Sequence, residues 1–118
     1  MIKVGINGFG RIGRLSLRAT LERKDVEVVA INDPFLSVEY MAYLFRHDSV
    51  HGKSLAKIEA RENALIVNDN VIMVYGFNNP AEIPWNEAGA DYIIESTGVF
   101  TDMKSATGHF EGGAKKVI

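Results

Sequence analysis

The chain has 118 residues, of which 47% are hydrophobic and 24% are charged, and its formal net charge at pH 7 is −2. This composition excludes disorder and collagen, and the charge balance gives no electrostatic footprint for nucleic acid or an anionic membrane. A chain of this length fits one domain at most. The absence of cysteine excludes disulfides, thiolate-bound zinc and a thiol nucleophile, so we expect a reduced, cytoplasmic setting.

The first half of the chain alternates between strand and helix patterns. Residues 2–6 form an apolar run that predicts a buried parallel strand, and residues 12–22 predict an amphipathic helix after a glycine cluster. Residues 26–31 predict a second buried strand, which ends at the following proline. Ser37 is a candidate N-cap for a second helix, and residues 47–52 read as a loop. The arginines of the first helix are interpreted as a solvated face.

The second half begins with a different pattern. Residues 55–75 alternate apolar and polar positions around a polar segment at 68–70, which predicts antiparallel strands joined by a tight turn. The segment 78–85, which includes Ile83-Pro84-Trp85, reads as a loop. Residues 90–95 predict a strand, residues 103–110 a helix, and residues 115–118 a further strand.

This order of elements predicts an α/β fold of the Rossmann type. The sheet is doubly wound and largely parallel, with an inserted antiparallel hairpin. Because the chain stops inside an apolar strand pattern, we expect residues 1–118 to be the N-terminal piece of a longer protein. Such a piece is expected to expose an apolar sheet edge.

The segment from Gly8 to Gly13 reads G-x-G-x-x-G. The motif alone is weak, but here it follows a predicted strand and opens a predicted helix, as dinucleotide binding requires. The first glycine permits the turn, the second allows the pyrophosphate to approach, and the third allows helix and strand to pack closely. The amides at the helix start then hold the phosphates. The alternative is a glycine-rich turn without a ligand.

Asp33 lies 20 residues beyond Gly13, at the end of the second predicted strand. A carboxylate at this place accepts hydrogen bonds from the adenosine ribose, and it would repel a 2′-phosphate, so it favours NAD over NADP. The alternative is that Asn32-Asp33-Pro34 is only a turn. Ser96-Thr97-Gly98 ends a third strand at the same expected crevice, although this tripeptide alone is equally consistent with a simple turn.

Two other patterns are incomplete. Gly52-Lys53-Ser54 resembles the end of a phosphate-binding P-loop, but His47 stands where the first glycine is needed. His47 and His51 have metal-pair spacing without an evident third ligand, so we expect no metal site.

A longer pattern covers the whole chain. Residues 5–14 read GINGFGRIGR, which is far more specific than the bare motif. Further segments stay in register with it, at residues 31–35, 40–41, 47–52, 83–85, 95–100 and 112–118. Together they resemble the N-terminal, NAD-binding part of glyceraldehyde-3-phosphate dehydrogenase. The resemblance implies that residues 1–118 are an incomplete NAD-binding domain of the Rossmann type and that the catalytic domain is absent from this chain.

The resemblance implies a set of cofactor-binding residues. Those along the NAD phosphates would be Asn7, Gly8, Phe9, Gly10, Arg11, Ile12 and Gly13, with the main-chain amides of Arg11 and Ile12 as donors. Asn32, Asp33 and Pro34 would flank the adenosine, and Ser96, Thr97, Gly98 and Phe100 would extend toward the nicotinamide. Asn78 stands where many relatives carry a basic residue, so only its main chain would contact the adenine side.

The resemblance also implies the reaction, which is the glycolytic oxidation and phosphorylation of glyceraldehyde 3-phosphate with NAD in an enzyme that is usually a homotetramer. That reaction uses a cysteine nucleophile and a histidine base. No catalytic residue is assigned within this chain, since it contains no cysteine, and the chain alone is expected to be inactive. The alternatives are a stand-alone nucleotide-binding or interaction module that has lost the chemistry, and a Rossmann dehydrogenase of another substrate class.

Overall fold

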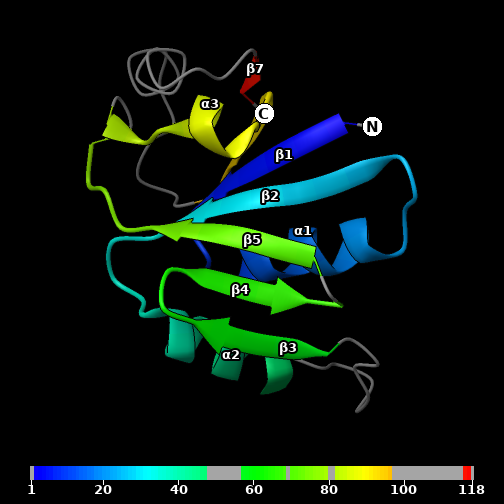
Figure 1. Ribbon diagram of the computed structural model, residues 1–118, viewed down its shortest axis with the longest axis vertical. Coiled ribbons are helices and arrows are strands. Elements are labelled where there is room, and N and C mark those ends of the chain that lie inside the picture. The colour runs from blue at the N-terminus through cyan, green and yellow to red at the C-terminus, as the bar shows by residue number, and fades with distance from the viewer. Residues whose placement is uncertain (1, 48–56, 69, 80–81, 97–115, 118) are drawn as a thin grey trace.

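The structure is a computed structural model that describes residues 2–47, 57–68, 70–79, 82–96 and 116–117. Within these ranges the chain forms a seven-stranded sheet and three helices (Figure 1). In chain order the elements are β1 (Ile2–Asn7), α1 (Arg11–Leu21), β2 (Val26–Asn32), α2 (Val38–His47), β3 (Ile58–Arg61), β4 (Ala64–Val67), β5 (Asn70–Tyr75), α3 (Trp85–Ala88), β6 (Tyr92–Glu95) and β7 (Lys116–Val117).

The sheet has the strand order β3-β4-β5-β2-β1-β6-β7. The pairs β5–β2, β2–β1, β1–β6 and β6–β7 are parallel, whereas β3–β4 and β4–β5 are antiparallel. The predicted Rossmann-type, largely parallel sheet with an antiparallel insertion is therefore confirmed. One detail was not predicted: β5 closes the antiparallel segment and also runs parallel beside β2, so it belongs to both parts of the sheet.

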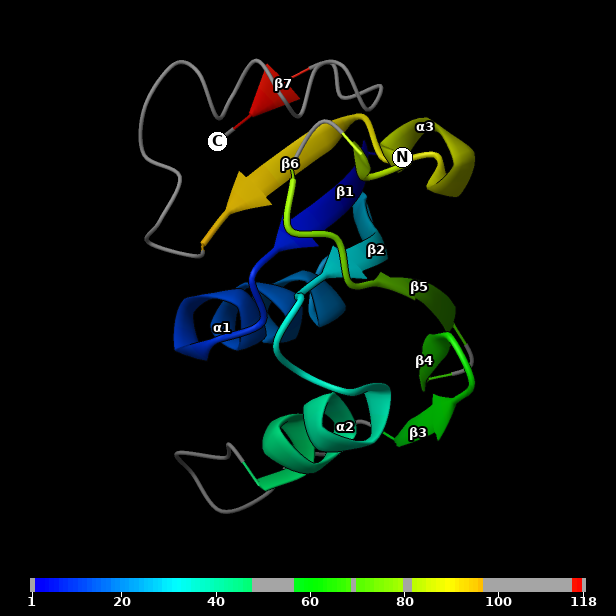
Figure 2. The ribbon, with the colours of Figure 1, turned by 90° about the vertical axis from the view of Figure 1, so that its left-hand side faces the viewer.

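The main core lies between one face of the sheet and the two longer helices. Figure 2 shows α1 and α2 on the same side of the sheet. Ile6, Leu17 and Ile31 are almost fully buried in this core, and the rings of Phe9 and Phe45 stack with centroids 6.5 Å apart. Burying a side chain of this size contributes roughly 1.5–3 kcal/mol, so these contacts fix both helices on the sheet.

The arginines of α1 are not simply a solvated face. The guanidinium of Arg18 lies 4.3 Å above the centroid of the Phe45 ring and donates a hydrogen bond of 2.7 Å to the Phe45 carbonyl. Arg14 likewise donates to the Phe9 carbonyl at 3.1 Å. Both side chains therefore satisfy main-chain carbonyls of neighbouring segments, and the interpretation of the whole row as solvated charge is wrong for these two residues.

The opposite face of the sheet carries a second core around Trp85, which is fully buried with Ile83, Ala90 and Ile93. The sequence placed Trp85 in a loop, whereas the structure shows that it begins α3, a helix of four residues. So short a helix leaves no periodic pattern to detect. Gly5 is required beneath it, because a Cβ there would lie 2.5 Å from the Trp85 ring.

The ends of α2 give one confirmation and one correction. The Ser37 hydroxyl accepts a hydrogen bond from the Tyr40 amide at 3.1 Å, so the predicted cap is confirmed. His47, expected in a loop, is the last residue of α2. The rest of that loop, with His51, and the helix expected over 103–110 lie outside the described residues. None of the described helices has the length and apolar character needed to cross a membrane.

Candidate functional site

The candidate site lies where four parallel strands end. Asn7 of β1 is in register with Asn32 of β2 and with Glu95 of β6, and Asn32 is in register with Tyr75 of β5. The segments that leave these strands are therefore adjacent in space. In open α/β sheets, ligands bind in the crevice outside the carboxyl ends of the strands.

The glycine turn after β1 has a tightly fixed main chain. Gly8 has a φ of 95°, a conformation that favours glycine. Its amide donates to the Asn32 carbonyl at 2.7 Å, and its carbonyl accepts from the Ser96 hydroxyl at 2.7 Å. A Cβ on Gly13 would collide with that same carbonyl, whereas a Cβ on Gly10 would meet nothing within 4 Å. Gly13 thus serves helix packing, while Gly10 leaves open space.

Helix α1 begins directly at this open space. Gly10 is its N-cap and makes no side-chain cap, and the amide of Arg14 closes the first turn on the Gly10 carbonyl at 2.9 Å. An α-helix leaves the amides before that bond, here those of residues 11–13, without partners inside the helix. These amides and the positive end of the helix dipole suit an anionic group.

Phe9 contributes differently from its glycine neighbours. Its side chain is fully buried in the main core, its amide donates to the carboxylate of Asp33 at 2.9 Å, and its carbonyl accepts from Arg14. Both main-chain polar groups of Phe9 therefore have protein partners.

Asp33 faces the glycine turn. Its Oδ2 accepts from the Phe9 amide at 2.9 Å, and its Oδ1 accepts from the Phe35 amide at 2.8 Å. The residue is 9% exposed, so the side chain is held in place yet still reaches the surface of the site. Each carboxylate oxygen retains accepting capacity beyond one hydrogen bond. The structure thus brings the two predicted parts of the site, the turn and the carboxylate, into direct contact.

A cavity of about 320 Å³ opens between these segments. It is lined by Asn7, Gly8, Gly10, Asn32, Asp33, Pro34, Phe35, Phe77, Asn78 and Ser96. Arg11, Ile12 and Gly13 are at the start of α1, beside Gly10. The other predicted site residues, Thr97, Gly98 and Phe100, lie outside the described residues.

Two aromatic residues of this cavity were not predicted as part of the site. Phe35 and Phe77 are 87% and 38% exposed, and both line the cavity. Phe35 directly follows Pro34, so its place beside Asp33 offered a signal. Phe77 carried none, because it reaches the site only through the pairing of β5 with β2, which the sequence did not indicate.

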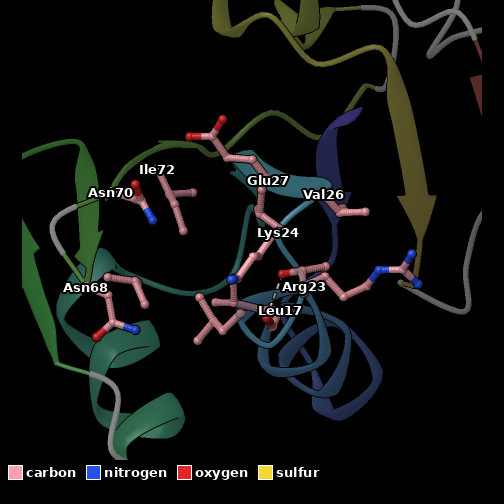
Figure 3. A pocket seen from close by; sticks show the side chains of 12 residues that line it. Leu17, Arg23, Lys24, Val26, Glu27, Asn68, Asn70 and Ile72 are labelled. Atoms are coloured by element: carbon pink, nitrogen blue, oxygen red, sulfur yellow. Dashed lines mark hydrogen bonds between the residues drawn. The ribbon is translucent and has the colours of Figure 1, made fainter. Parts of the chain in front are cut away.

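A second cavity, of about 420 Å³, lies at the opposite end of the sheet (Figure 3). Its lining includes Lys24, which precedes β2, and Glu27 within β2. Asn68, which precedes β5, and Asn70, which begins it, also contribute, and Leu17 of α1 adds an apolar wall. It lies at the amino ends of parallel strands, away from the crevice where such sheets bind ligands. Among the described residues, no group of acidic or histidine side chains is arranged to hold a metal ion.

A glycine turn between a parallel strand and a helix, faced by a carboxylate at the end of the next strand, defines a dinucleotide-binding domain of the Rossmann class. The family model for the NAD-binding domain of glyceraldehyde 3-phosphate dehydrogenase matches residues 2–103. The chain belongs to this family, whose cofactor is NAD.

Curated relatives agree over nearly the whole chain. The cytosolic glyceraldehyde-3-phosphate dehydrogenase of Gracilaria gracilis is 61% identical over 98% of this chain, and the enzyme of Yarrowia lipolytica is 57% identical over 99%. A cytosolic enzyme of Sinapis alba is 55% identical over 99%. The chain spans 35% of the length of each of these relatives.

The residues around the smaller cavity fit the cofactor chemically. The open space at Gly10 lets a diphosphate approach the start of α1. The Asp33 carboxylate is a hydrogen-bond acceptor for hydroxyl groups. Pro34, Phe35 and Phe77 give apolar surface for a planar base. The site thus offers a partner for each part of an adenosine diphosphate.

Proposed function

We propose that this chain binds NAD for a glyceraldehyde-3-phosphate dehydrogenase that oxidises and phosphorylates glyceraldehyde 3-phosphate in glycolysis. The observation that carries the proposal is the Asp33 carboxylate, held against the glycine turn by the Phe9 amide at 2.9 Å. This arrangement supports the proposal, because a carboxylate suits ribose hydroxyls and the nearby helix amides suit phosphate oxygens. The cytosolic names of two relatives support a cytoplasmic location.

The residues that line the cavity are assigned here to the successive parts of NAD. The main chain at the start of α1 holds the diphosphate beside Gly8 and Gly10, with the amides of Arg11 and Ile12 as donors. Asn32, Asp33 and Pro34 flank the adenosine, and Asn78 offers its main chain to the adenine. Asn7 and Ser96 also line the cavity; we place Asn7 along the phosphates and Ser96 toward the nicotinamide half. We extend that half to Thr97, Gly98 and Phe100 on the family resemblance.

NAD, when bound, supplies the capacity to accept a hydride from the substrate. The residues of this chain bind and orient it, and none is assigned a catalytic role. A thioester intermediate requires a thiol, and the chain contains no cysteine, so we expect the chain by itself to be inactive. We assign the nucleophile, the base and the substrate-phosphate sites to the part of the enzyme outside this chain, as the resemblance implies.

We also propose that the enzyme containing this chain is a homotetramer, as the resemblance implies. One exposed surface supports a subunit contact. Tyr40 and Tyr43 on α2 are about half exposed, and their rings stack with centroids 5.8 Å apart. The ring centroids of Tyr43 and His47 are 4.5 Å apart. Exposed aromatic rows of this kind are enriched in protein interfaces.

The substitution Gly10→Ala tests the cofactor site with little effect on the fold. Since a Cβ at this position meets no protein atom within 4 Å, we expect the midpoint of thermal unfolding to stay within about 2 °C of the parent. The same Cβ occupies the space through which the diphosphate approaches, so NAD affinity falls at least about tenfold. Calorimetric titration with NAD measures this. Unchanged affinity would show that the diphosphate does not lie against Gly10.

A further inference from the structure

The side chain of Asn32 is the centre of a buried hydrogen-bond network behind the cavity wall. It ends β2 and is 1% exposed. Its Nδ2 donates to Asn7 Oδ1 at 2.9 Å and to the Phe77 carbonyl at 3.0 Å, while its Oδ1 accepts from the Phe77 amide at 2.9 Å. An amide nitrogen carries two hydrogens, and both are used within the protein. Asn32 therefore has no amide hydrogen left for a ligand.

The orientation of this network is fixed from both ends. The Phe77 amide needs an acceptor and the Phe77 carbonyl needs a donor, which together determine which side-chain atom of Asn32 is oxygen. Asn7 Oδ1 accepts from Asn32, so Asn7 Nδ2 points the other way and donates to the Glu95 carboxylate at 2.9 Å. An ionised carboxylate accepts only. Neither amide can be reversed without leaving buried groups unpaired, which is costly.

Asn32 holds two parts of the cavity wall at once. Its side chain binds both main-chain groups of Phe77, whose ring is 38% exposed and lines the cavity next to Asn78. Its own main-chain carbonyl accepts from the Gly8 amide at 2.7 Å. The segment at 77–78 and the glycine turn are therefore set relative to each other through one residue.

We propose that Asn32 is a positioning residue that fixes the base end of the cavity and thereby determines discrimination between purines. This inference rests on the proposed binding of NAD. Adenine carries an amino donor at C6 and hypoxanthine carries a carbonyl acceptor there. The Phe77 carbonyl is bonded to Asn32, so the acceptor offered to the base is the main-chain carbonyl of the next residue, Asn78, which also lines the cavity. Held at a fixed position, this carbonyl distinguishes the two purines, and free to move it does so poorly.

The test compares NAD with nicotinamide hypoxanthine dinucleotide in calorimetric titrations of the parent, Asn32→Ala and Asn32→Asp. The aspartate variant is nearly isosteric and still accepts from the Phe77 amide, but it cannot donate to Asn7 or to the Phe77 carbonyl. We expect the parent to prefer NAD, and both variants to lose about tenfold of that preference. A loss of overall stability alone would weaken the binding of both dinucleotides equally and leave the ratio of their affinities unchanged.

The matched control is Asn68→Ala, which also removes an asparagine that accepts from a main-chain amide, that of Lys57 at 2.9 Å. Asn68 lines the cavity at the far end of the sheet, so the ratio of the two dinucleotide affinities in Asn68→Ala should equal that of the parent. Hydrogen exchange adds a readout without ligand. The Phe77 amide should exchange faster in Asn32→Ala, which removes its acceptor, and near the parent rate in Asn32→Asp, which keeps that acceptor. The Val74 amide, bonded to the Asn63 carbonyl at 2.9 Å, should be unchanged in both variants.

The possible results separate the two hypotheses. An Asn32 variant that keeps the full NAD preference, or a Phe77 amide that exchanges at the parent rate in Asn32→Ala, overturns the positioning role while the proposed function stands. A parent protein that binds neither dinucleotide contradicts the proposed function, and the purine discrimination built on it, even where the exchange result agrees.

Discussion

Replacing Asp33 with alanine is expected to weaken NAD binding about 100-fold, because hydrogen bonds to a charged group contribute roughly 1.5–3 kcal/mol each. The carboxylate accepts from the Phe9 and Phe35 amides and would accept from the ribose hydroxyls on its remaining lone pairs. The same change removes the charge that repels a 2′-phosphate, so affinity for NADP should fall much less. Paired titrations with NAD and NADP measure the ratio.

Asp25→Ala is the control for this substitution. Asp25 precedes β2, at the opposite end of the strand from Asp33, and its side chain pairs with Arg23 at 2.8 Å in an exposed position. The hydrogen bond from Arg23 lowers the pKa of the Asp25 carboxyl. Both variants replace one aspartate with alanine, but only Asp33 lies at the cavity. NAD affinity should be unchanged in the control. An Asp33→Ala protein that keeps its full preference for NAD over NADP would contradict the assignment.

The substitution Gly13→Ala is expected to destabilise the fold by about 3 kcal/mol, at the upper end of the range for overpacking a tight contact. The added Cβ would collide with the Gly8 carbonyl oxygen and would approach Ile6 Cγ2 to 3.2 Å. That carbonyl cannot easily move, since the Gly8 amide is bonded to Asn32 and the carbonyl itself to Ser96. Chemical denaturation followed by circular dichroism gives the free energy of unfolding.

Gly10→Ala provides the comparison for Gly13→Ala, because both add one methyl group to the same motif. One Cβ meets the protein and the other meets open space. The two substitutions should therefore separate stability from binding: Gly13→Ala unfolds more easily, while Gly10→Ala stays folded and binds NAD weakly. Equal losses of stability in the two variants would mean that the turn does not have the geometry described here.

The sequence predicted those parts of the fold that depend on local pattern. Apolar runs located β1 and β2, and alternation around residues 68–70 located the antiparallel strands, because burial on one or both faces leaves a readable period. It missed α3, whose four residues are too few for a period. It also missed the parallel pairing of β5 with β2, which depends on contacts between distant segments.

The candidate site likewise has parts that local pattern predicts and parts that depend on contacts between distant segments. Glycine spacing and the position of Asp33 after the second strand can be read from the sequence, and the structure places them in contact. The apolar wall at Phe77 and the Asn7–Asn32 network could not be read, because each joins residues that are 25 or 45 positions apart. The sequence identified Asn32 as a residue flanking adenosine, but only the hydrogen bonds of its amide indicate a positioning role.

The two amides that hold Asp33 have a thermodynamic consequence. A carboxylate that is already immobile loses no rotational freedom when an incoming molecule arrives, so the conformational entropy of recognition is spent during folding and not during association. The free energy of association then includes no cost for ordering this side chain. Changes in the concentration of the dinucleotide would then alter how often the cavity is occupied, and the position of the Asp33 carboxylate would stay the same.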